Sequence, residues 1–271
     1  MTKLIAHISD LHLLGRSASS RAIDPRTQIV SVMRPVDPPS RYLRVLRALT
    51  LAISARADHI VLSGDMTELG RPHQFEELAE ALSDAEIDGP RVTLVPGNHD
   101  RYDEPRAFER ALAGPLRPWA RQASEFAGKV VDLGTICLLP LDVTIPQSVA
   151  RSRGVFTSDM AEALKKRLAT FRRSQRVAVV QHHPPTTRAP VVHWFHGLQG
   201  ADREREILDE RVQILHGHTH AATTESIDGR DNALLGASAT VDDPEGIARV
   251  NLYWVTDAGL TPVYMAKPIA A

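Results

Sequence analysis

Short runs of β-branched and aliphatic residues alternate with longer segments of helical periodicity along most of this chain. Such alternation predicts βαβ units around a central sheet, because parallel strands need a long crossover between them. Strands are expected at residues 4–8, 59–62, 91–95, 130–133, 136–141, 177–181 and 212–215. Helices are expected at residues 40–55, 74–82 and 158–171, the first of them capped by Ser40. This pattern indicates the α/β class.

The last third of the chain has a different pattern, in which short strand-like runs follow one another without long helical segments. They lie at residues 223–227, 233–235, 247–255 and 260–265, and Asp257-Ala258-Gly259 is typical of a hairpin turn. We expect these runs to form an antiparallel sheet that completes a sandwich. Residues 15–39, rich in Ser, Arg and Pro, are expected to form a long loop. A chain of 271 residues without internal repeats fits a single domain over residues 1–271.

Composition limits the binding partners that we expect for this protein and the cellular compartment in which we expect it. A formal net charge of -1 argues against general affinity for nucleic-acid polymers, which bind surfaces with a basic excess. The single cysteine, Cys137, lies between apolar neighbours and is expected to be a buried strand thiol. The N-terminus lacks the features of a secretory signal, and no apolar run approaches the roughly 20 residues that span a bilayer. We therefore expect a cytoplasmic protein without a transmembrane segment.

Residues that commonly bind metals follow five of the expected strands. In chain order they are Asp10 and His12, then Asp65, then Asn98 and His99, then His182, and finally His218 and His220. Open α/β sheets bind ligands at the carboxyl ends of their strands, which is where these side chains are expected. Asn is a poor ligand alone, so Asn98 gains meaning only where carboxylates and imidazoles complete a site for divalent cations. Together the five positions predict a polynuclear metal site.

The order Asp-x-His, Gly-Asp, Gly-Asn-His-Asp, His and Gly-His-x-His, from Asp10 to His220, resembles the calcineurin-like metallophosphoesterase superfamily. Within it, Gly64-Asp65-Met66-Thr67-Glu68-Leu69-Gly70 and His182-His183-Pro184-Pro185 resemble the class III cyclic-nucleotide phosphodiesterase and glycerophosphodiesterase branch. The Asp-Arg-Gly element of protein Ser/Thr phosphatases is missing after Gly64-Asp65. The resemblance implies a four-layer αββα sandwich of two mixed β-sheets flanked by helices, with a binuclear metal site at the carboxyl ends of the strands.

The resemblance also implies which residues are ligands. One metal would be held by Asp10, His12, Asp65 and His220, and the second by the bridging Asp65 with Asn98, His182 and His218. A bridging carboxylate independently suits two cations about 3.5–4 Å apart, which would otherwise repel each other. Mixed carboxylate, amide and imidazole ligation favours Mn, Fe, Zn or Co ions over Ca²⁺ or Mg²⁺. Because thiolates are missing from the set, the choice among these metals stays open.

The chemistry expected at such a site is phosphoester hydrolysis. A hydroxide that bridges the two metals attacks phosphorus in line, while the metals neutralise the developing charge. His99 is the candidate proton donor to a phosphoryl oxygen or to the leaving alkoxide, and Asp100 is expected to orient its ring. A structural role is the alternative for His99. His183 either contacts the substrate phosphate or lines the rim of the site.

These residues predict a metal-dependent phosphodiesterase that hydrolyses a small phosphodiester, with a cyclic nucleotide such as 3′,5′-cAMP as the first choice. The alternatives are a glycerophosphodiester or a nucleotide-linked lipid pyrophosphate as substrate. A non-catalytic scaffold is a further alternative, although all seven expected ligand positions are filled. Residues 186–198 are apolar and aromatic. They are expected to form a lid that contacts a base or an acyl chain, or else to pack on a neighbouring subunit of a homo-oligomer.

Overall fold

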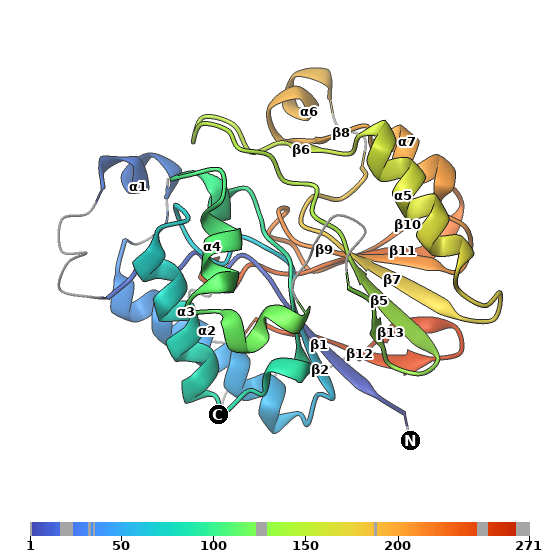
Figure 1. Ribbon diagram of the computed structural model, residues 1–271, viewed down its shortest axis with the longest axis horizontal. Coiled ribbons are helices and arrows are strands. Elements are labelled where there is room, and N and C mark those ends of the chain that lie inside the picture. Colours follow the sequence, from blue (N-terminus) through green and yellow to red (C-terminus); the bar gives the residue numbers. More distant parts are fainter. Residues whose placement is uncertain are drawn as a thin grey trace.

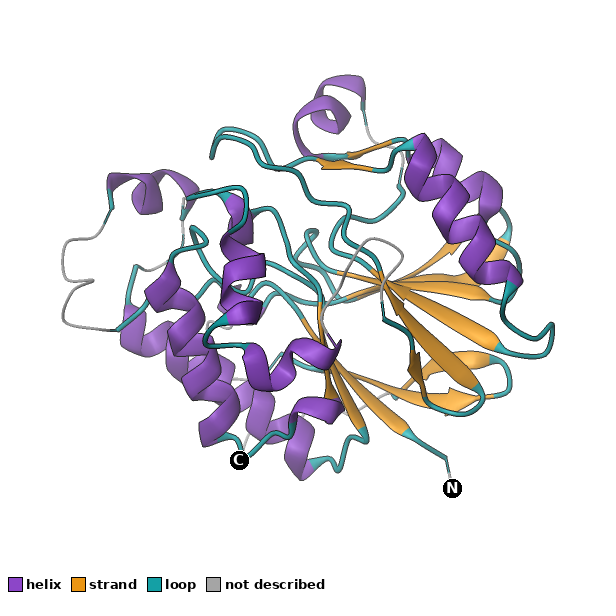
Figure 2. Cartoon of the chain, viewed as in Figure 1, coloured by secondary structure: helices purple, strands orange, loops and turns teal. Residues whose placement is uncertain are grey.

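The computed structural model describes residues 2–16, 24–31, 34, 36–122, 129–186, 189–242 and 249–263. Two large β-sheets lie against each other, and helices cover both outer faces (Figure 1; Figure 2). This arrangement confirms the four-layer αββα sandwich of two mixed sheets. A separate pair of short strands, β6 (Gly154–Val155) and β8 (Leu198–Gln199), joins two segments that lie outside the large sheets.

The first sheet has the strand order β13-β12-β1-β2-β3. Its members are β1 (Leu4–Ile8), β2 (His59–Leu62), β3 (Val92–Leu94), β12 (Asn251–Thr256) and β13 (Gly259–Pro262). The first three strands are parallel, and the chain passes between them through α2 (Pro38–Ser54) and α3 (Pro72–Asp84). β12 pairs antiparallel with β1 and turns at Asp257-Ala258 into β13, so the predicted hairpin is confirmed.

The second sheet has the strand order β10-β11-β9-β7-β5-β4. Its members are β4 (Val131–Asp132), β5 (Ile136–Pro140), β7 (Arg176–Val180), β9 (Val212–His216), β10 (Thr223–Ile227) and β11 (Arg230–Gly236). The four central strands are parallel, and the two edge strands are antiparallel to their neighbours. Helices α5 (Ser158–Ala169) and α7 (Ala201–Ile207) precede β7 and β9.

The C-terminal strands do not form a sheet of their own, so that expectation is wrong. β10 and β11 extend the second sheet beside β9, whereas β12 and β13 extend the first sheet beside β1. The physical reason is that β1 and β9 would otherwise expose unpaired backbone groups at a sheet edge. The buried side chains of Leu235 and Tyr253 also reach the cluster between the two sheets, each from its own side. Residues 247–248 and 264–265 of the expected strands lie outside the described residues.

A short helix, α1 (Pro25–Val30), lies where a long loop was expected. The Asp24 side chain caps it by accepting a hydrogen bond from the backbone N–H of Arg26 at 2.8 Å. Helix α2 likewise begins at Pro38, with Asp37 at its N-cap, and not after Ser40. Both starts follow from proline, whose fixed φ suits a first helical turn and which lacks the N–H that this turn leaves unpaired. The remaining described helical segments are α4 (Ala107–Ala113), α6 (Pro190–His196), and the 3₁₀ turns Gly89–Arg91, His99–Arg101, Arg117–Gln122 and Thr240–Asp242.

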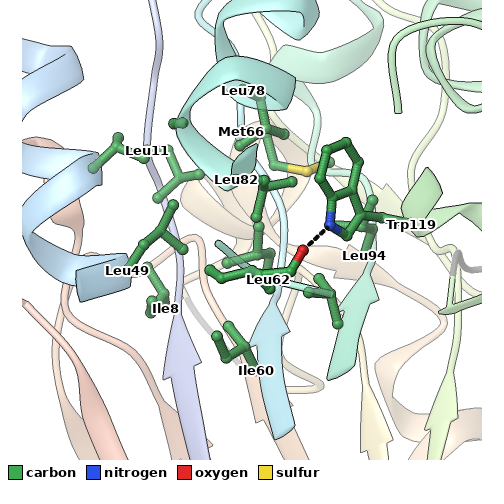
Figure 3. Close-up of a cluster of buried hydrophobic side chains, with 14 of the residues drawn as sticks. Ile8, Leu11, Leu49, Ile60, Leu62, Met66, Leu78, Leu82, Leu94 and Trp119 are labelled. Atoms are coloured by element: carbon green, nitrogen blue, oxygen red, sulfur yellow. Dashed lines mark hydrogen bonds between the residues drawn. The ribbon is translucent and has the colours of Figure 1, made fainter. Parts of the chain in front are cut away.

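Among the described residues, three clusters of buried apolar side chains fill the three spaces between the four layers. The largest lies between the first sheet and its helices, where Leu78 of α3 and Leu62 of β2 are fully buried (Figure 3). Trp119 belongs to this cluster, and its indole N–H donates to the carbonyl oxygen of Ile87 at 2.9 Å. A second cluster joins the facing sides of the two sheets, and a third packs α5 and α7 on the second sheet. The layers are therefore held by burial of apolar surface at each junction.

The thiol of Cys137 is buried in β5, as predicted, and burial raises its pKa to about 11. None of the helices in the described ranges is both long and apolar enough to cross a membrane.

Candidate metal centre

The loops that follow the parallel strands of both sheets meet at one end of the sandwich. The backbone N–H of Asp10, after β1, donates to the carbonyl oxygen of Gly64 at 3.0 Å. The backbone N–H of His12 donates to the backbone carbonyl oxygen of Asp65 at 2.9 Å. From the second sheet, the N–H of His218 donates to the Asp10 carboxylate at 3.2 Å. Loops from β1, β2 and β9 are thereby tied directly together.

The backbone of several expected ligands is strained. Positive φ angles occur at Asp10 (53°), His12 (49°), Asp65 (49°), His218 (66°) and His220 (57°). For residues with a Cβ this left-handed conformation costs about 1–2 kcal/mol each, and it persists only where the surrounding structure holds it. The hydrogen bonds between the loops supply that restraint. The strain therefore concentrates where the side chains converge.

One group of side chains gathers around Asp10. The Oδ1 atom of Asp10 lies 3.3 Å from Nε2 of His220 and 4.0 Å from Nε2 of His12. A ligand atom from each of these three residues lies within 4.8 Å of the other two. The same His12 atom is 3.9 Å from Oδ2 of Asp65. These are the residues that the family resemblance implied for the first metal.

A second group gathers around His182. Its Nε2 atom lies 3.2 Å from Oδ2 of Asp65, the oxygen that also faces His12. The ring of His218 is 5.2 Å from that of His182 between centroids, and the two residues form a potential ligand group with His183. Asp65 therefore lies between the two groups.

The donor atoms of this cluster fit metal ions. Four of them are buried and make no hydrogen bond in the described part of the chain, although the first and last lie near an oppositely charged group: Asp10 Oδ1, His12 Nε2, Asn98 Oδ1 and His182 Nε2. Leaving a buried polar atom unpaired costs about 1–3 kcal/mol, so a convergent set of such atoms is unusual unless a ligand satisfies it. Nitrogen and oxygen donors without thiolate suit the first-row transition metals that the sequence indicated.

The second ring nitrogen of each expected histidine ligand lies close to an oxygen atom. His182 Nδ1 pairs with the carbonyl oxygen of Ser63 at 2.8 Å, and His12 Nδ1 lies 3.2 Å from the Glu68 carboxylate. The remaining two pairs are His220 with Asp242 at 2.6 Å, and His218 with the carbonyl of His196 at 2.8 Å. Such partners fix the tautomer and the orientation of a metal-binding imidazole.

Sequence reasoning did not find Glu68 and Asp242 as partners of the histidines. Glu68 lies in the Gly64–Gly70 motif, three residues after Asp65. Its place in this motif was the feature of the sequence that could have marked it as a residue of the site. No motif marks Asp242. It lies at the end of the 3₁₀ turn Thr240–Asp242, and only the fold brings it to His220.

The charges in the cluster depend on one another. Burial raises the pKa of the Asp65 carboxyl, but positive charge on His182 and His99 outweighs burial and holds this pKa well below its usual value. Burial lowers the pKa of His182, but the Asp65 carboxylate raises it to about 9. An ionised Asp65 surrounded by imidazoles is an arrangement in which metal cations would replace protons.

The side chains of His99 and Asp100, neighbours in the Gly-Asn-His-Asp motif, have different partners in the structure. His99 Nδ1 pairs with the carbonyl oxygen of Glu68 at 2.8 Å, and its Nε2 lies 3.9 Å from Oδ2 of Asp65. The Asp100 carboxylate does not orient this ring, contrary to expectation. It accepts hydrogen bonds from the backbone N–H groups of Met66, Thr67 and Gly97. Because His99 and Asp100 are neighbours in a 3₁₀ turn, their side chains point about 120° apart, and Asp100 ties two loops together instead.

His183 does not line the rim, because its side chain is completely buried. Its Nε2 donates to the carbonyl oxygen of Ser152 at 2.7 Å, and its ring lies 4.3 Å from that of His218. Burial lowers the pKa of His183 to about 3, so the ring is neutral. Its Nδ1 atom is buried without a partner in the described residues and lies beside Gly154 of the chain.

Comparison with known proteins places this chain in a family. The sequence model of the calcineurin-like phosphoesterase family matches residues 3–222. The chain belongs to this family. It is therefore a metal-dependent phosphoester hydrolase, as the motifs predicted.

Relatives of this phosphoesterase confirm the predicted branch. A probable cyclic nucleotide phosphodiesterase of Rhodococcus erythropolis is 26% identical over 83% of this chain and 67% of its own length. A cAMP/cGMP dual specificity phosphodiesterase of Mycobacterium tuberculosis is 25% identical, over 89% and 69% of the two chains. A glycerophosphodiester phosphodiesterase of Enterobacter lignolyticus is 26% identical, over 67% and 57%.

Solved structures agree with the fold of this phosphoesterase. A dimetal phosphatase from Danio rerio is similar with a TM-score of 0.67 over 93% of this chain and 92% of that one, at 14% identity. At this identity the similarity concerns the fold alone.

Two segments of the phosphoesterase lie outside the large sheets, and we call them the cap (residues 144–155 and 189–200). They are joined by β6 and β8, and α6 stands apart from the two helical layers (Figure 1). Ser152 and His196, one from each segment, accept the hydrogen bonds from His183 and His218. On α6, Trp194 is 45% exposed, and the guanidinium carbon of Arg151 lies 4.5 Å from its ring centroid. Thr187 and Arg188 of the expected lid lie outside the described residues.

Proposed function

We propose that the protein is a two-metal phosphodiesterase that hydrolyses a small phosphodiester, with 3′,5′-cAMP as its first candidate substrate. The observation that carries the proposal is the set of buried donor atoms without partners, which converges from both sheets on the two sides of Asp65. Relatives named as cyclic nucleotide phosphodiesterases support the choice of substrate.

In the proposed site, Asp10, His12 and His220 would hold one ion, Asn98, His182 and His218 would hold the other, and Asp65 would contact both. The ions belong to the Mn, Fe, Zn and Co group. When bound, two such ions lower the pKa of water and neutralise charge on a phosphoryl group.

His99 has the geometry of a proton donor in this proposal. Its Nδ1 is committed to the carbonyl oxygen of Glu68, which leaves Nε2 directed toward Asp65. A proton on this Nε2 would pass to the leaving oxygen as the bond from phosphorus to that oxygen breaks. Contact of His183 with the phosphoryl group would require its buried Nδ1 to become accessible on substrate binding, because its Nε2 is held by Ser152.

The cap supports a substrate that carries an aromatic base. Trp194 is 45% exposed, with the Arg151 guanidinium over its ring, and stacking of bases on aromatic side chains contributes about 1–3 kcal/mol per base. A second candidate substrate, a nucleotide-linked lipid pyrophosphate, is favoured by one observation. Val191 is 71% exposed and Val192 is 43% exposed on the same helix, which would suit an acyl chain. A glycerophosphodiester is the third candidate, because one relative is named for this activity.

A substrate comparison tests the proposal. Protein stripped with a chelator and reloaded with Mn²⁺, Fe²⁺, Zn²⁺ or Co²⁺ is offered bis-p-nitrophenyl phosphate and p-nitrophenyl phosphate. We expect the diester to be preferred, whereas preference for the monoester would indicate a phosphatase. No turnover of either compound with any metal would support the non-catalytic scaffold instead.

The same metal-loaded protein is then offered 3′,5′-cAMP, a glycerophosphodiester and a nucleotide-linked lipid pyrophosphate. Trp194→Ala should raise KM for the cyclic nucleotide by about tenfold and leave bis-p-nitrophenyl phosphate hydrolysis nearly unchanged. Trp254→Ala is the matched control, because this tryptophan is 42% exposed in β12, away from the cap. An equal effect of both variants would remove Trp194 from substrate recognition.

A further inference from the structure

The hydroxyl of Tyr102 joins a metal-site residue to the cap. It accepts a hydrogen bond from Nδ2 of Asn98 at 2.8 Å and donates one to the carbonyl oxygen of Arg151 at 2.8 Å. The side chain is almost completely buried, and its ring lies 4.7 Å from the ring of His99 between centroids. Tyr102 follows the 3₁₀ turn His99–Arg101 directly, so it is held close to both residues.

These two hydrogen bonds have a direction that the chemistry determines. A backbone carbonyl can only accept, so the single proton of the Tyr102 hydroxyl must point toward Arg151. The hydroxyl oxygen then has only lone pairs to offer Asn98, and it must receive the amide N–H. The amide oxygen of Asn98 therefore faces the other way, where it is buried without a partner in the described residues.

Amide orientation decides whether Asn98 can bind a cation. The two ends of the amide are nearly equal in size, but only the oxygen has lone pairs for a metal, and the NH₂ group would repel one. Nothing in the size of the side chain selects the correct orientation. In this structure the selection comes from the carbonyl of Arg151 in the cap, passed on by one hydroxyl.

We propose that Tyr102 is a positioning residue that makes Asn98 a ligand of the second metal ion, by holding its amide oxygen toward the site. This inference rests on the metal site proposed above. It also gives the cap a second role. Because the carbonyl oxygen of Arg151 takes the proton of the Tyr102 hydroxyl, that hydroxyl can only accept a hydrogen bond from Asn98.

Tyr102→Phe tests the inference, because it deletes the hydroxyl and keeps the ring against His99. The readout is Mn²⁺ binding by calorimetry, with electron paramagnetic resonance to distinguish single from coupled pairs of ions. We expect one of the two sites to keep its affinity and the dissociation constant of the other, which Asn98 would help to form, to rise about tenfold or more. The spin-coupled signal should be clearly weaker at Mn²⁺ concentrations that just saturate the unmodified protein.

Tyr253→Phe is the matched control. The Tyr253 hydroxyl also accepts a hydrogen bond from an asparagine amide, Nδ2 of Asn251 at 3.3 Å, but it lies in β12. Its removal should leave both Mn²⁺ affinities unchanged. Equal affinities in Tyr102→Phe and the unmodified protein would overturn the proposal. Failure of the unmodified protein to bind two ions would instead count against the proposed metal site.

A test in the Asn98→Asp variant distinguishes a positioning role of Tyr102 from general damage to the fold. In Asn98→Asp either end of the side chain is an oxygen, so its orientation no longer matters for binding a cation. Adding Tyr102→Phe to this variant should change Mn²⁺ affinity by less than about twofold, against the tenfold effect expected with Asn98 present. A tenfold loss in both backgrounds would show that the hydroxyl acts on something other than the Asn98 amide and would overturn the proposal.

Discussion

Oε2 of Glu68 lies 3.2 Å from Nδ1 of His12, and both side chains are completely buried. The other contacts of this carboxylate include a hydrogen bond from the hydroxyl of Ser31 at 2.7 Å and an ion pair with Arg41. Arg41 in turn donates to the carbonyl oxygen of His12 at 2.9 Å. His12 is thus held at its ring and at its backbone by one buried network, which leaves Nε2 directed toward Asp10 and Asp65.

Glu68→Gln should weaken metal binding without unfolding the protein. The amide oxygen can still accept hydrogen bonds, but it cannot supply the negative charge that makes the His12 ring a stronger donor. We expect about a 10- to 100-fold loss of Mn²⁺ affinity, measured by competition with a chelator. Glu77→Gln is the control, because Glu77 is also buried and bonded to an arginine, Arg16. Equal losses in the two variants would contradict a specific link to His12.

His99→Ala should lower kcat by about 10²- to 10⁴-fold with a poor leaving group such as the alkoxide of 3′,5′-cAMP. The effect should be much smaller with bis-p-nitrophenyl phosphate, since p-nitrophenolate leaves without protonation. Metal content, measured by elemental analysis, must stay at two ions per chain for the comparison to hold. Near-normal turnover of the cyclic nucleotide with both metals bound would rule out the role of proton donor.

Glu204 should make stability depend on pH. It is completely buried, and burial raises its pKa to about 8, while its hydrogen bond from Gln181 acts in the opposite direction. The folded state therefore keeps a proton that the unfolded chain loses above its ordinary pKa of 4.5. This contribution to stability is complete below pH 4.5 and is lost as the pH rises toward 8.

Glu204→Gln removes the titrating group and keeps the shape. We expect equal stability to the unmodified protein near pH 4.5, and a gain at pH 8 of at most about 5 kcal/mol. Urea unfolding of metal-free protein at both values measures this difference. If the two proteins were equally stable at pH 8, Glu204 would ionise in the folded state without a free-energy cost, contrary to the expectation from burial.

Gly97→Ala should disrupt the metal site because there is no room for the added methyl group. A Cβ at this position would lie 2.1 Å from Oδ1 of Asp65 and 2.3 Å from its backbone nitrogen, so the loops after β2 and β3 would have to separate. We expect loss of at least one ion and a lower melting temperature. Gly134→Ala is the control: it has a strained φ of +96° but no atom within 4 Å of the added Cβ. It should cost about 1–2 kcal/mol of stability and keep both ions. Intact metal binding by Gly97→Ala would contradict the tight packing of these loops.

Much of the first sheet and of the site was predictable because its signals are local. Residues 4–8 and 59–62 are short, mostly apolar runs of strand length with one histidine each, and they form β1 and β2 over the expected residues. The helix at residues 25–30 was missed although Asp24-Pro25 is a local start signal, because the surrounding Ser, Arg and Pro content favoured a loop. The placement of β12 beside β1 could not be predicted, since strand pairing depends on which edges remain free after the whole sheet has formed.

The sequence by itself determined the kind of chemistry. The identity and order of Asp10, His12, Asp65, Asn98 and the later histidines are properties of short strand-to-loop segments, and the donor atoms of a side chain do not depend on the fold. Only the tertiary structure decided how these donors are held. Asp242 reaches His220, and Arg151 directs the amide of Asn98 through Tyr102, by contacts between distant parts of the chain. Packing of the two sheets against each other brings such residues together, and no local pattern records that packing.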